Sequence, residues 1–160
     1  MVDCRSVAEL LSGRYVLHND DLRPIFLRLS RMLLRLPKAG YMPIRNDADY
    51  VRWSPREYNG VADYAVNRTL DEAKDWSDID LNAVRVALSR KQNILVCVDG
   101  GLRNGKLGAC GFAIYTAHWN DVFEYEFLGW QGTQLNGVAS AFLAETLGLE
   151  ASLNFLVDLF

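Results

Sequence analysis

The sequence has 160 residues, half of them hydrophobic, and its 17 basic and 20 acidic residues give a formal net charge of −3. This length and composition are typical of one globular domain and argue against disorder, collagen or a coiled coil. A net charge this close to zero excludes a strongly basic nucleic-acid coat, although it leaves room for a local basic patch.

Cysteine is sparse: the chain contains Cys4, Cys97 and Cys110, and no two of them have the spacing of a zinc or redox motif. We expect free thiols, with Cys97 buried and inert, and a reducing, intracellular compartment. The first residues lack the apolar segment of a signal peptide, and no apolar stretch approaches a membrane span of about 20 residues. The sequence therefore predicts no membrane association.

Helical spacing of apolar residues predicts three helices in the first half of the chain. The first covers residues 4–12, and the second begins after the N-cap candidates at 19–21 and runs to Leu36, ahead of Pro37. The third covers residues 61–73. A short strand is expected at 50–53, where apolar and polar side chains alternate.

The second half has the pattern of an antiparallel meander. Strands are predicted at residues 93–98, 109–117 and 122–130, joined by short glycine turns such as Asn104-Gly105. One long helix follows at 138–156. Residues 75–92 separate the two halves and are predicted to be a connector with room for one helix, on which no core contact depends.

Four acidic residues stand where a carboxylate can be functional. Asp99 ends an apolar strand ahead of two glycines, a place where α/β sheets carry chemistry. Glu145 lies within a predicted helix among apolar or small neighbours, so its side chain can point into a cleft. Asp63 is in the first turn of its helix, and Asp3 precedes another helix. Taken singly, each also has a structural explanation. Asp99 can be a turn residue, and Glu145 an exposed glutamate on an amphipathic helix. Asp63 can simply favour the helix dipole, and Asp3 can be a solvated residue near the terminus.

Four segments resemble motifs of the ribonuclease H family in its reverse-transcriptase-like and plant-type form. VDGGLRNGKLGACGFAIYTA resembles the family's first hairpin, and ASAFLAETLGLEASL, with Ala144-Glu145, resembles its first helix. SPREYNGVADYAVNRTL resembles the closing motif Pro-Arg-Glu-x-Asn-x-x-Ala-Asp-x-x-Ala-Asn. VDCRSVAELLSG resembles the segment Asp-Ser-x-x-Val-x-x-x-Leu-x-Gly that opens the family's second half. The closing motif is the most specific match and the N-terminal one the least.

The order of these motifs is permuted relative to the family. Residues 1–74 resemble the family's second half, residues 93–160 resemble its first half, and the connector 75–92 joins what are normally the two chain ends. The resemblance therefore implies a single α/β domain with a circularly permuted ribonuclease-H-like fold, in which helices flank a mixed sheet of about five strands.

The resemblance also implies that Asp99, Glu145, Asp3 and Asp63 form an acidic tetrad, which binds two Mg²⁺ or Mn²⁺ ions and cleaves the RNA strand of RNA–DNA hybrids. In that scheme Asp99 bridges both ions and Asp63 holds the ion on the attacking side. Glu145 holds the other ion and contacts a 2′-hydroxyl of the cleaved strand. The chemistry is consistent, because converging carboxylates repel each other unless a cation lies among them, and hard oxygen ligands favour Mg²⁺ or Mn²⁺ over zinc.

Some features of the family are missing. The histidine that many members carry shortly before the closing aspartate is replaced by Ser54-Pro55-Arg56, and neither His18 nor His118 fits that place. The polar pair that often precedes the helix glutamate is here Ala141-Phe142. Substrate contacts are expected from Gly100, Asn104, Ser140 and Arg56, and from the arginine stripe Arg28, Arg31 and Arg35, which is alternatively a solvated helix face.

Two other hypotheses are open from the sequence. One is a catalytically weak ribonuclease-H-like nucleic-acid-binding or scaffold module of a reverse-transcriptase or retroelement polyprotein, which the net charge of −3 slightly favours. The other keeps the fold and changes the substrate, as in resolvases and 3′–5′ exonucleases. We expect a monomer, with a domain-swapped dimer as the alternative.

Overall fold

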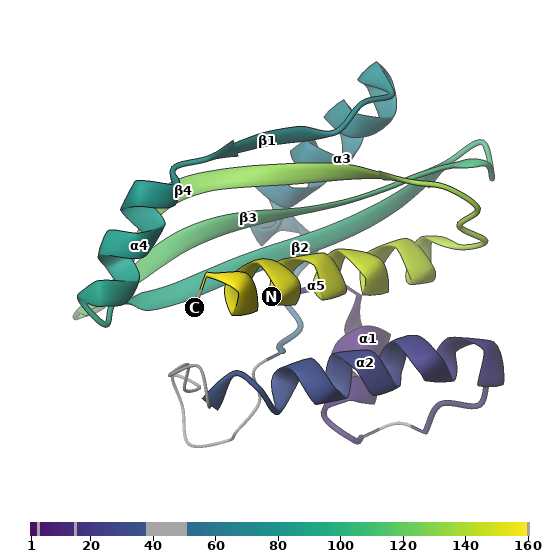
Figure 1. Ribbon diagram of the computed structural model, residues 1–160, viewed down its shortest axis with the longest axis horizontal. Coiled ribbons are helices and arrows are strands. Elements are labelled where there is room, and N and C mark those ends of the chain that lie inside the picture. The colour runs from purple at the N-terminus through teal and green to yellow at the C-terminus, as the bar shows by residue number, and fades with distance from the viewer. Residues whose placement is uncertain (3, 15, 38–50, 160) are drawn as a thin grey trace.

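The computed structural model describes residues 1–2, 4–14, 16–37 and 51–159. Asp3 and Tyr50, on which sequence-based expectations rest, lie outside the described residues. The described part of the chain forms one antiparallel sheet with helices against both of its faces (Figure 1).

The sheet has four strands in the order β1-β4-β3-β2, and every neighbouring pair is antiparallel. The strands are β1 (Trp76–Ile79), β2 (Asn93–Arg103), β3 (Leu107–Asn120) and β4 (Val122–Leu135). The last three confirm the predicted meander and are longer than expected, because pairing continues through their glycine-containing ends. Between β2 and β3, Asn104 and Gly105 both have positive φ, as a tight type I′ hairpin turn requires.

Five α-helices lie within the described residues: α1 (Arg5–Leu11), α2 (Arg23–Leu33), α3 (Gly60–Glu72), α4 (Leu81–Ser89) and α5 (Ala141–Asp158). The predicted helices are confirmed with shifts at their ends, and the second ends at Leu33 rather than at Leu36. The last helix begins later than expected because the Ser140 hydroxyl accepts a hydrogen bond of 3.1 Å from the Leu143 amide and caps it. None of these described helices is long and apolar enough to span a membrane.

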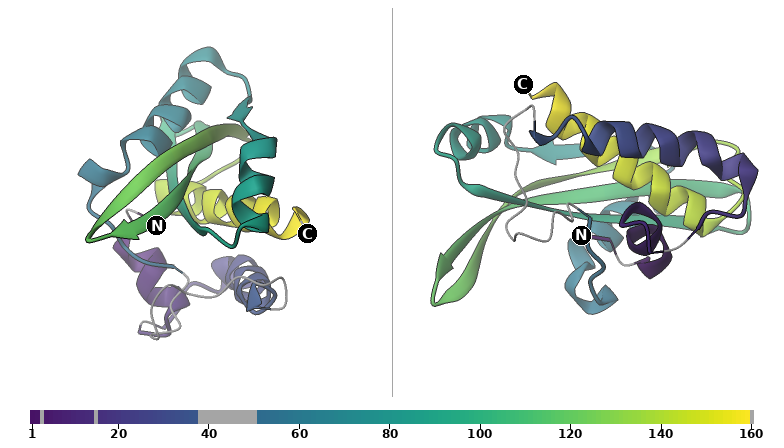
Figure 2. Two further views of the ribbon diagram at one scale, coloured as in Figure 1. Left: turned by 90° about the vertical axis from the view of Figure 1, so that its left-hand side faces the viewer. Right: turned by 90° about the horizontal axis from the view of Figure 1, so that it is seen from below.

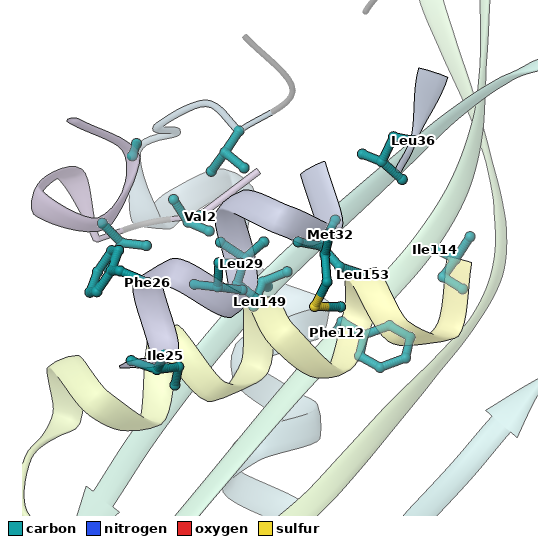
Figure 3. Packing of buried hydrophobic residues seen from close by; sticks show 14 of the residues in the cluster. Val2, Ile25, Phe26, Leu29, Met32, Leu36, Phe112, Ile114, Leu149 and Leu153 are labelled. Atoms are coloured by element: carbon teal, nitrogen blue, oxygen red, sulfur yellow. The ribbon is translucent and has the colours of Figure 1, made fainter. Parts of the chain in front are cut away.

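Side chains alternate along β3 between the two faces of the sheet, and each face has its own hydrophobic core. Phe112 and Ile114 belong to the larger core, together with residues of α2 and α5 (Figure 3). The helix α4 also contributes to this core. Ala113, between them, packs with Ala65 of α3 and Trp130 of β4 on the opposite face. The helices α3 and α5 therefore lie on opposite faces of the sheet (Figure 2).

The first residues of the chain lie beside the outer edge of β2. Val2 makes two isolated parallel bridges, one to Val98 of β2 and one to Trp53. The strand β2 therefore contacts the N-terminal residues directly. The sheet itself has four strands and not about five. In the strand expected at 50–53, the described residues 51–53 make only an isolated bridge, from Trp53 to Val2.

Residues 75–92 are part of the folded domain and not only a connector. They contain α4, the one helix expected there, and also β1, which pairs with residues 129–132 of β4. The side chains of Val84 and Ala87 are buried in the larger core. The expectation that no core contact depends on this segment is therefore wrong, because the apolar face of α4 closes one end of that core.

Val84 and Val86 form a matched pair for testing this role, since they lie in the same helix and are 0% and 45% exposed. Replacing Val84 with alanine removes buried methyl groups, so the free energy of unfolding should fall by about 2 kcal/mol. The control Val86→Ala makes the same change in helix propensity and should lose less than about 0.5 kcal/mol. Urea unfolding followed by circular dichroism measures both, and equal losses would contradict a core role for α4.

Candidate functional site

Three of the four predicted acidic residues, Asp63, Asp99 and Glu145, line one pocket of about 370 Å³. They come from the first turn of α3, from β2 and from the second turn of α5, which are far apart in the sequence. The fourth, Asp3, lies outside the described residues, although its neighbour Cys4 also lines the pocket. We call this cavity the acidic pocket.

The helix α5 crosses β2 in direct backbone contact. A Cβ atom added to Gly100 would lie 2.1 Å from the backbone nitrogen of Glu145, and one added to Gly148 would lie 2.8 Å from the carbonyl oxygen of Asp99. Both distances are too short for a real carbon contact, so only glycine fits at these positions without a shift of the helix. The two glycines thereby bring Glu145 next to the strand segment that carries Asp99.

Asp99 and Glu145 are nearly buried, with 6% and 3% of their surface exposed. The Gly100 amide donates to Asp99 Oδ1 at 2.8 Å, and the Cys4 amide donates to Glu145 Oε1 at 3.2 Å. Amide hydrogen bonds favour the charged form of a carboxylate, whereas burial and a second negative charge disfavour it. A cation in the acidic pocket would offset the cost of burying these two like charges.

Asp63 is more exposed than the other two, and both of its carboxylate oxygens have partners. Arg56 donates to Asp63 Oδ1 at 2.9 Å, and the Asn67 side-chain amide donates to Asp63 Oδ2 at 3.0 Å. Because 33% of the Asp63 side chain is exposed, solvent screens this ion pair, which is worth less than about 1 kcal/mol. Asp63 can therefore exchange Arg56 for another cation at little cost.

Asn59 ties the start of α3 to the strand residue that precedes Asp99. Its buried side-chain amide donates to the Val98 carbonyl at 2.7 Å. Its Oδ1 atom is buried and has no hydrogen-bond partner among the described residues. The bond to β2 helps to fix the distance between the first turn of α3, which carries Asp63, and Asp99.

Two of the expected substrate contacts, Gly100 and Arg56, line the acidic pocket. Asn67 and Arg103 line it as well, although the sequence did not single them out as site residues. Arg103 also forms an ion pair with Asp71 of α3. Asn67 could have been identified from the sequence, because it lies four residues after Asp63 in the same helix. Arg103 could not, because only the fold brings this residue at the end of β2 to the site.

The remaining expected substrate contacts do not line this pocket: Asn104, Ser140, Arg28, Arg31 and Arg35. Asn104 forms the turn between β2 and β3, and Ser140 caps α5. Arg28 donates to both carboxylate oxygens of Glu150 on α5, at 2.6 and 3.3 Å, and this hydrogen bonding raises the pKa of Arg28. In the structure Arg28 therefore joins α2 to α5.

The three cysteines are free thiols, as expected. Burial raises the pKa of the Cys97 thiol and raises that of Cys110 to about 12. Both are protonated at neutral pH and are poor nucleophiles, so neither contributes thiolate chemistry.

The donor atoms of the acidic pocket suit a hard divalent cation, because Asp63, Asp99 and Glu145 supply carboxylate oxygens. Within the described ranges, no group of three or more histidine, cysteine, aspartate or glutamate side chains is arranged to hold a metal ion. The ion pair with Arg56 holds the Asp63 carboxylate in its present orientation. Coordination by all three carboxylates would therefore require Asp63 to leave Arg56.

Comparisons of the chain with models of protein families, with curated proteins and with solved structures found no match.

Gly100→Ala tests the contact that brings Glu145 next to Asp99. The added methyl group meets the backbone of α5, so the free energy of unfolding should fall by about 3 kcal/mol. Gly60→Ala is the matched control, because a Cβ there meets nothing within 4 Å, and it should cost less than about 0.5 kcal/mol. Thermal and urea unfolding measure both variants. Unchanged stability of Gly100→Ala would mean that α5 does not contact β2 at this point.

Proposed function

We propose that this protein is a divalent-metal-dependent endonuclease that hydrolyses the RNA strand of RNA–DNA hybrids. The observation that carries the proposal is the convergence of Asp63, Asp99 and Glu145 on one pocket. These are three of the four residues that the resemblance to ribonuclease H implies as metal ligands.

The path of the chain supports a circularly permuted ribonuclease-H-like fold. Val2, which precedes Asp3, pairs in parallel with Val98, which precedes Asp99. Residues 1–74 and 93–160 thus meet at the acidic pocket, although their order is reversed relative to the family. The four-stranded sheet itself is antiparallel and not mixed as expected, and the parallel bridges of Val2 lie at its edge, outside the named strands.

In the proposed enzyme Asp99, Glu145, Asp63 and Asp3 would hold two Mg²⁺ or Mn²⁺ ions. When bound, such ions activate a water molecule and stabilise the departing 3′-oxygen of the cleaved phosphodiester. Carboxylate oxygens and a partly open pocket suit ions that must also accept water and phosphate ligands.

The other residues of the pocket orient these carboxylates and receive the substrate. The amides of Gly100 and Cys4 each fix one oxygen of a buried carboxylate. Arg56 can transfer its hydrogen bond from Asp63 to a phosphate oxygen, a charge-assisted contact that is at least as favourable. Arg103, on the β2 side of the pocket, supplies a second guanidinium for the same strand.

Asp99→Asn is the direct test of catalysis. The amide keeps the size of the side chain and an acceptor for the Gly100 amide but removes the charge that holds the ions. Cleavage of a labelled RNA–DNA hybrid in Mg²⁺ should fall at least about a thousandfold, because several kcal/mol of transition-state stabilisation are lost. Glu57→Gln, an exposed acid that does not line the pocket, should cleave like the wild type. RNA and DNA duplexes, and EDTA in place of metal, complete the assay. A near wild-type rate for Asp99→Asn would refute the proposed role of Asp99.

Thermal unfolding gives a readout of metal binding that does not depend on cleavage. At ten times its dissociation constant, Mn²⁺ should raise the midpoint of the wild type by about 4 °C. Asp99→Asn should shift by less than about 1 °C. In EDTA, Asp99→Asn should unfold at or above the wild-type temperature, because one of two buried like charges is gone. Equal Mn²⁺ shifts in both proteins would place the metal elsewhere.

One observation favours the second candidate function, a ribonuclease-H-like module that binds hybrids without efficient cleavage. Both oxygens of Asp63 are engaged by Arg56 and Asn67, and the usual histidine ahead of the closing aspartate is absent from the sequence. Such a module would bind hybrid in EDTA and leave it intact in both Mg²⁺ and Mn²⁺. The cleavage assay above therefore separates the two candidates.

A further inference from the structure

A second pocket, of about 360 Å³, lies beside the acidic one and is rich in arginine. Its polar and aromatic lining is supplied by α1, the residues just after it and the segment 51–53: Arg5, Glu9, Arg14, Arg52 and Trp53. Residues 5–14 and 51–53 are distant in sequence and meet because Val2 bridges to Trp53. We call this cavity the arginine pocket.

The charge of the arginine pocket is opposite to that of the chain as a whole. Among the described residues, three arginines and one glutamate line it, a surplus of two positive charges in a protein of net charge −3. Glu9 accepts a hydrogen bond of 2.7 Å from Arg5 and is itself largely buried, so it positions that guanidinium. Arg14 and Arg52 also interact within the chain. Such a local concentration of guanidinium groups selects an anionic ligand.

Trp53 gives the pocket a flat aromatic wall. The residue is 47% exposed, so part of its ring is accessible to a ligand. The guanidinium of Arg5 lies over its ring, 6.0 Å from the centroid. An indole beside several guanidinium groups is the combination that binds single-stranded nucleic acid, since bases stack on the ring while phosphates meet the cations.

The arginine pocket adjoins the acidic pocket. Cys4 lines the acidic pocket and Arg5, the next residue, lines the arginine pocket. On the neighbouring segment, Arg56 lines the first and Trp53 the second. Consecutive Cα atoms are about 3.8 Å apart, so a strand that leaves one pocket needs only a few nucleotides to reach the other.

We propose that the arginine pocket binds a single-stranded extension of the nucleic acid whose duplex part enters the acidic pocket. Arg14 and Arg52 contact phosphates of the extension, and an unpaired base stacks on the exposed part of the Trp53 ring. This inference rests on the proposed function for the presence of a duplex in the acidic pocket. The preferred substrate is then a junction between hybrid and single strand rather than a continuous hybrid.

Equilibrium binding in EDTA tests this, because no cleavage occurs there. A blunt hybrid is compared with hybrids that carry an extension of about six nucleotides on each of the four strand ends in turn. At least one extended hybrid should bind the wild type about tenfold tighter than the blunt one, as expected for one stacked base. Trp53→Ala should abolish that gain, and Trp53→Phe, which keeps a stacking face, should retain most of it. If no extension improves binding, or if Trp53→Ala keeps the full gain, the inference is wrong.

A charge variant keeps the test valid even if Trp53→Ala folds poorly. Arg14→Gln with Arg52→Gln should lower the salt dependence of binding to the preferred extended hybrid by about 1.4 in log–log slope, the value for two single-strand phosphates. The control Arg85→Gln with Arg90→Gln, which removes two exposed charges from α4 and the residue that follows it, should leave the slope unchanged. Equal slopes for the two double variants would overturn the inference.

The outcome is separable from that of the proposed function. If the extension effect is present but no hybrid is cleaved in Mg²⁺ or Mn²⁺, the arginine pocket stands and the catalytic proposal fails. If hybrids are cleaved but extensions have no effect, the catalytic proposal stands and the arginine pocket is refuted.

Discussion

The contact between β2 and α5 is the constraint on which the rest of the site depends. Two glycines, Gly100 in the strand and Gly148 in the helix, let the two backbones touch without side chains between them. An ordinary helix–sheet contact would hold Glu145 several ångströms further from Asp99, because side chains would fill the space. Here the hydrophobic core, through Leu149 and Leu153 of the same helix, presses α5 onto β2 and so sustains the approach of two acidic residues.

That approach concentrates negative charge where little water can screen it. Asp99 and Glu145 are almost fully buried where β2 and α5 touch at Gly100, and buried like charges destabilise a fold unless something compensates them. Backbone amides supply part of the compensation. Arg56, on the more exposed side of the pocket, is bound to Asp63 through a weak, solvent-screened pair. In our proposal a divalent cation would take Asp99 and Glu145 as its buried ligands and Asp63 as its exchangeable one.

Much of this could be predicted from the sequence, and the rest could not for identifiable reasons. The meander and the long final helix have strong periodic patterns, and Asp99 and Glu145 stand out because they interrupt apolar segments. The strand β1 was missed because its four residues carry no alternation; it pairs where Gly129 of β4 lets the backbone of Asp78 approach within contact distance. From the sequence, the arginine stripe Arg28, Arg31 and Arg35 could be either a set of substrate contacts or a solvated helix face. The bond from Arg28 to Glu150 could not be predicted, since it depends on how α2 and α5 pack. The same holds for the arginine pocket, whose two halves meet only in the folded chain.

Anomalous diffraction from crystals grown with Mn²⁺ tests the central claim most directly, because it locates the ion without reference to activity. Our account predicts anomalous density in the acidic pocket, in contact with carboxylate oxygens of Asp99 and Glu145, with Asp63 turned away from Arg56 toward the ion. Density confined to surface carboxylates elsewhere, with an empty acidic pocket and the ion pair between Arg56 and Asp63 intact at saturating Mn²⁺, would contradict it.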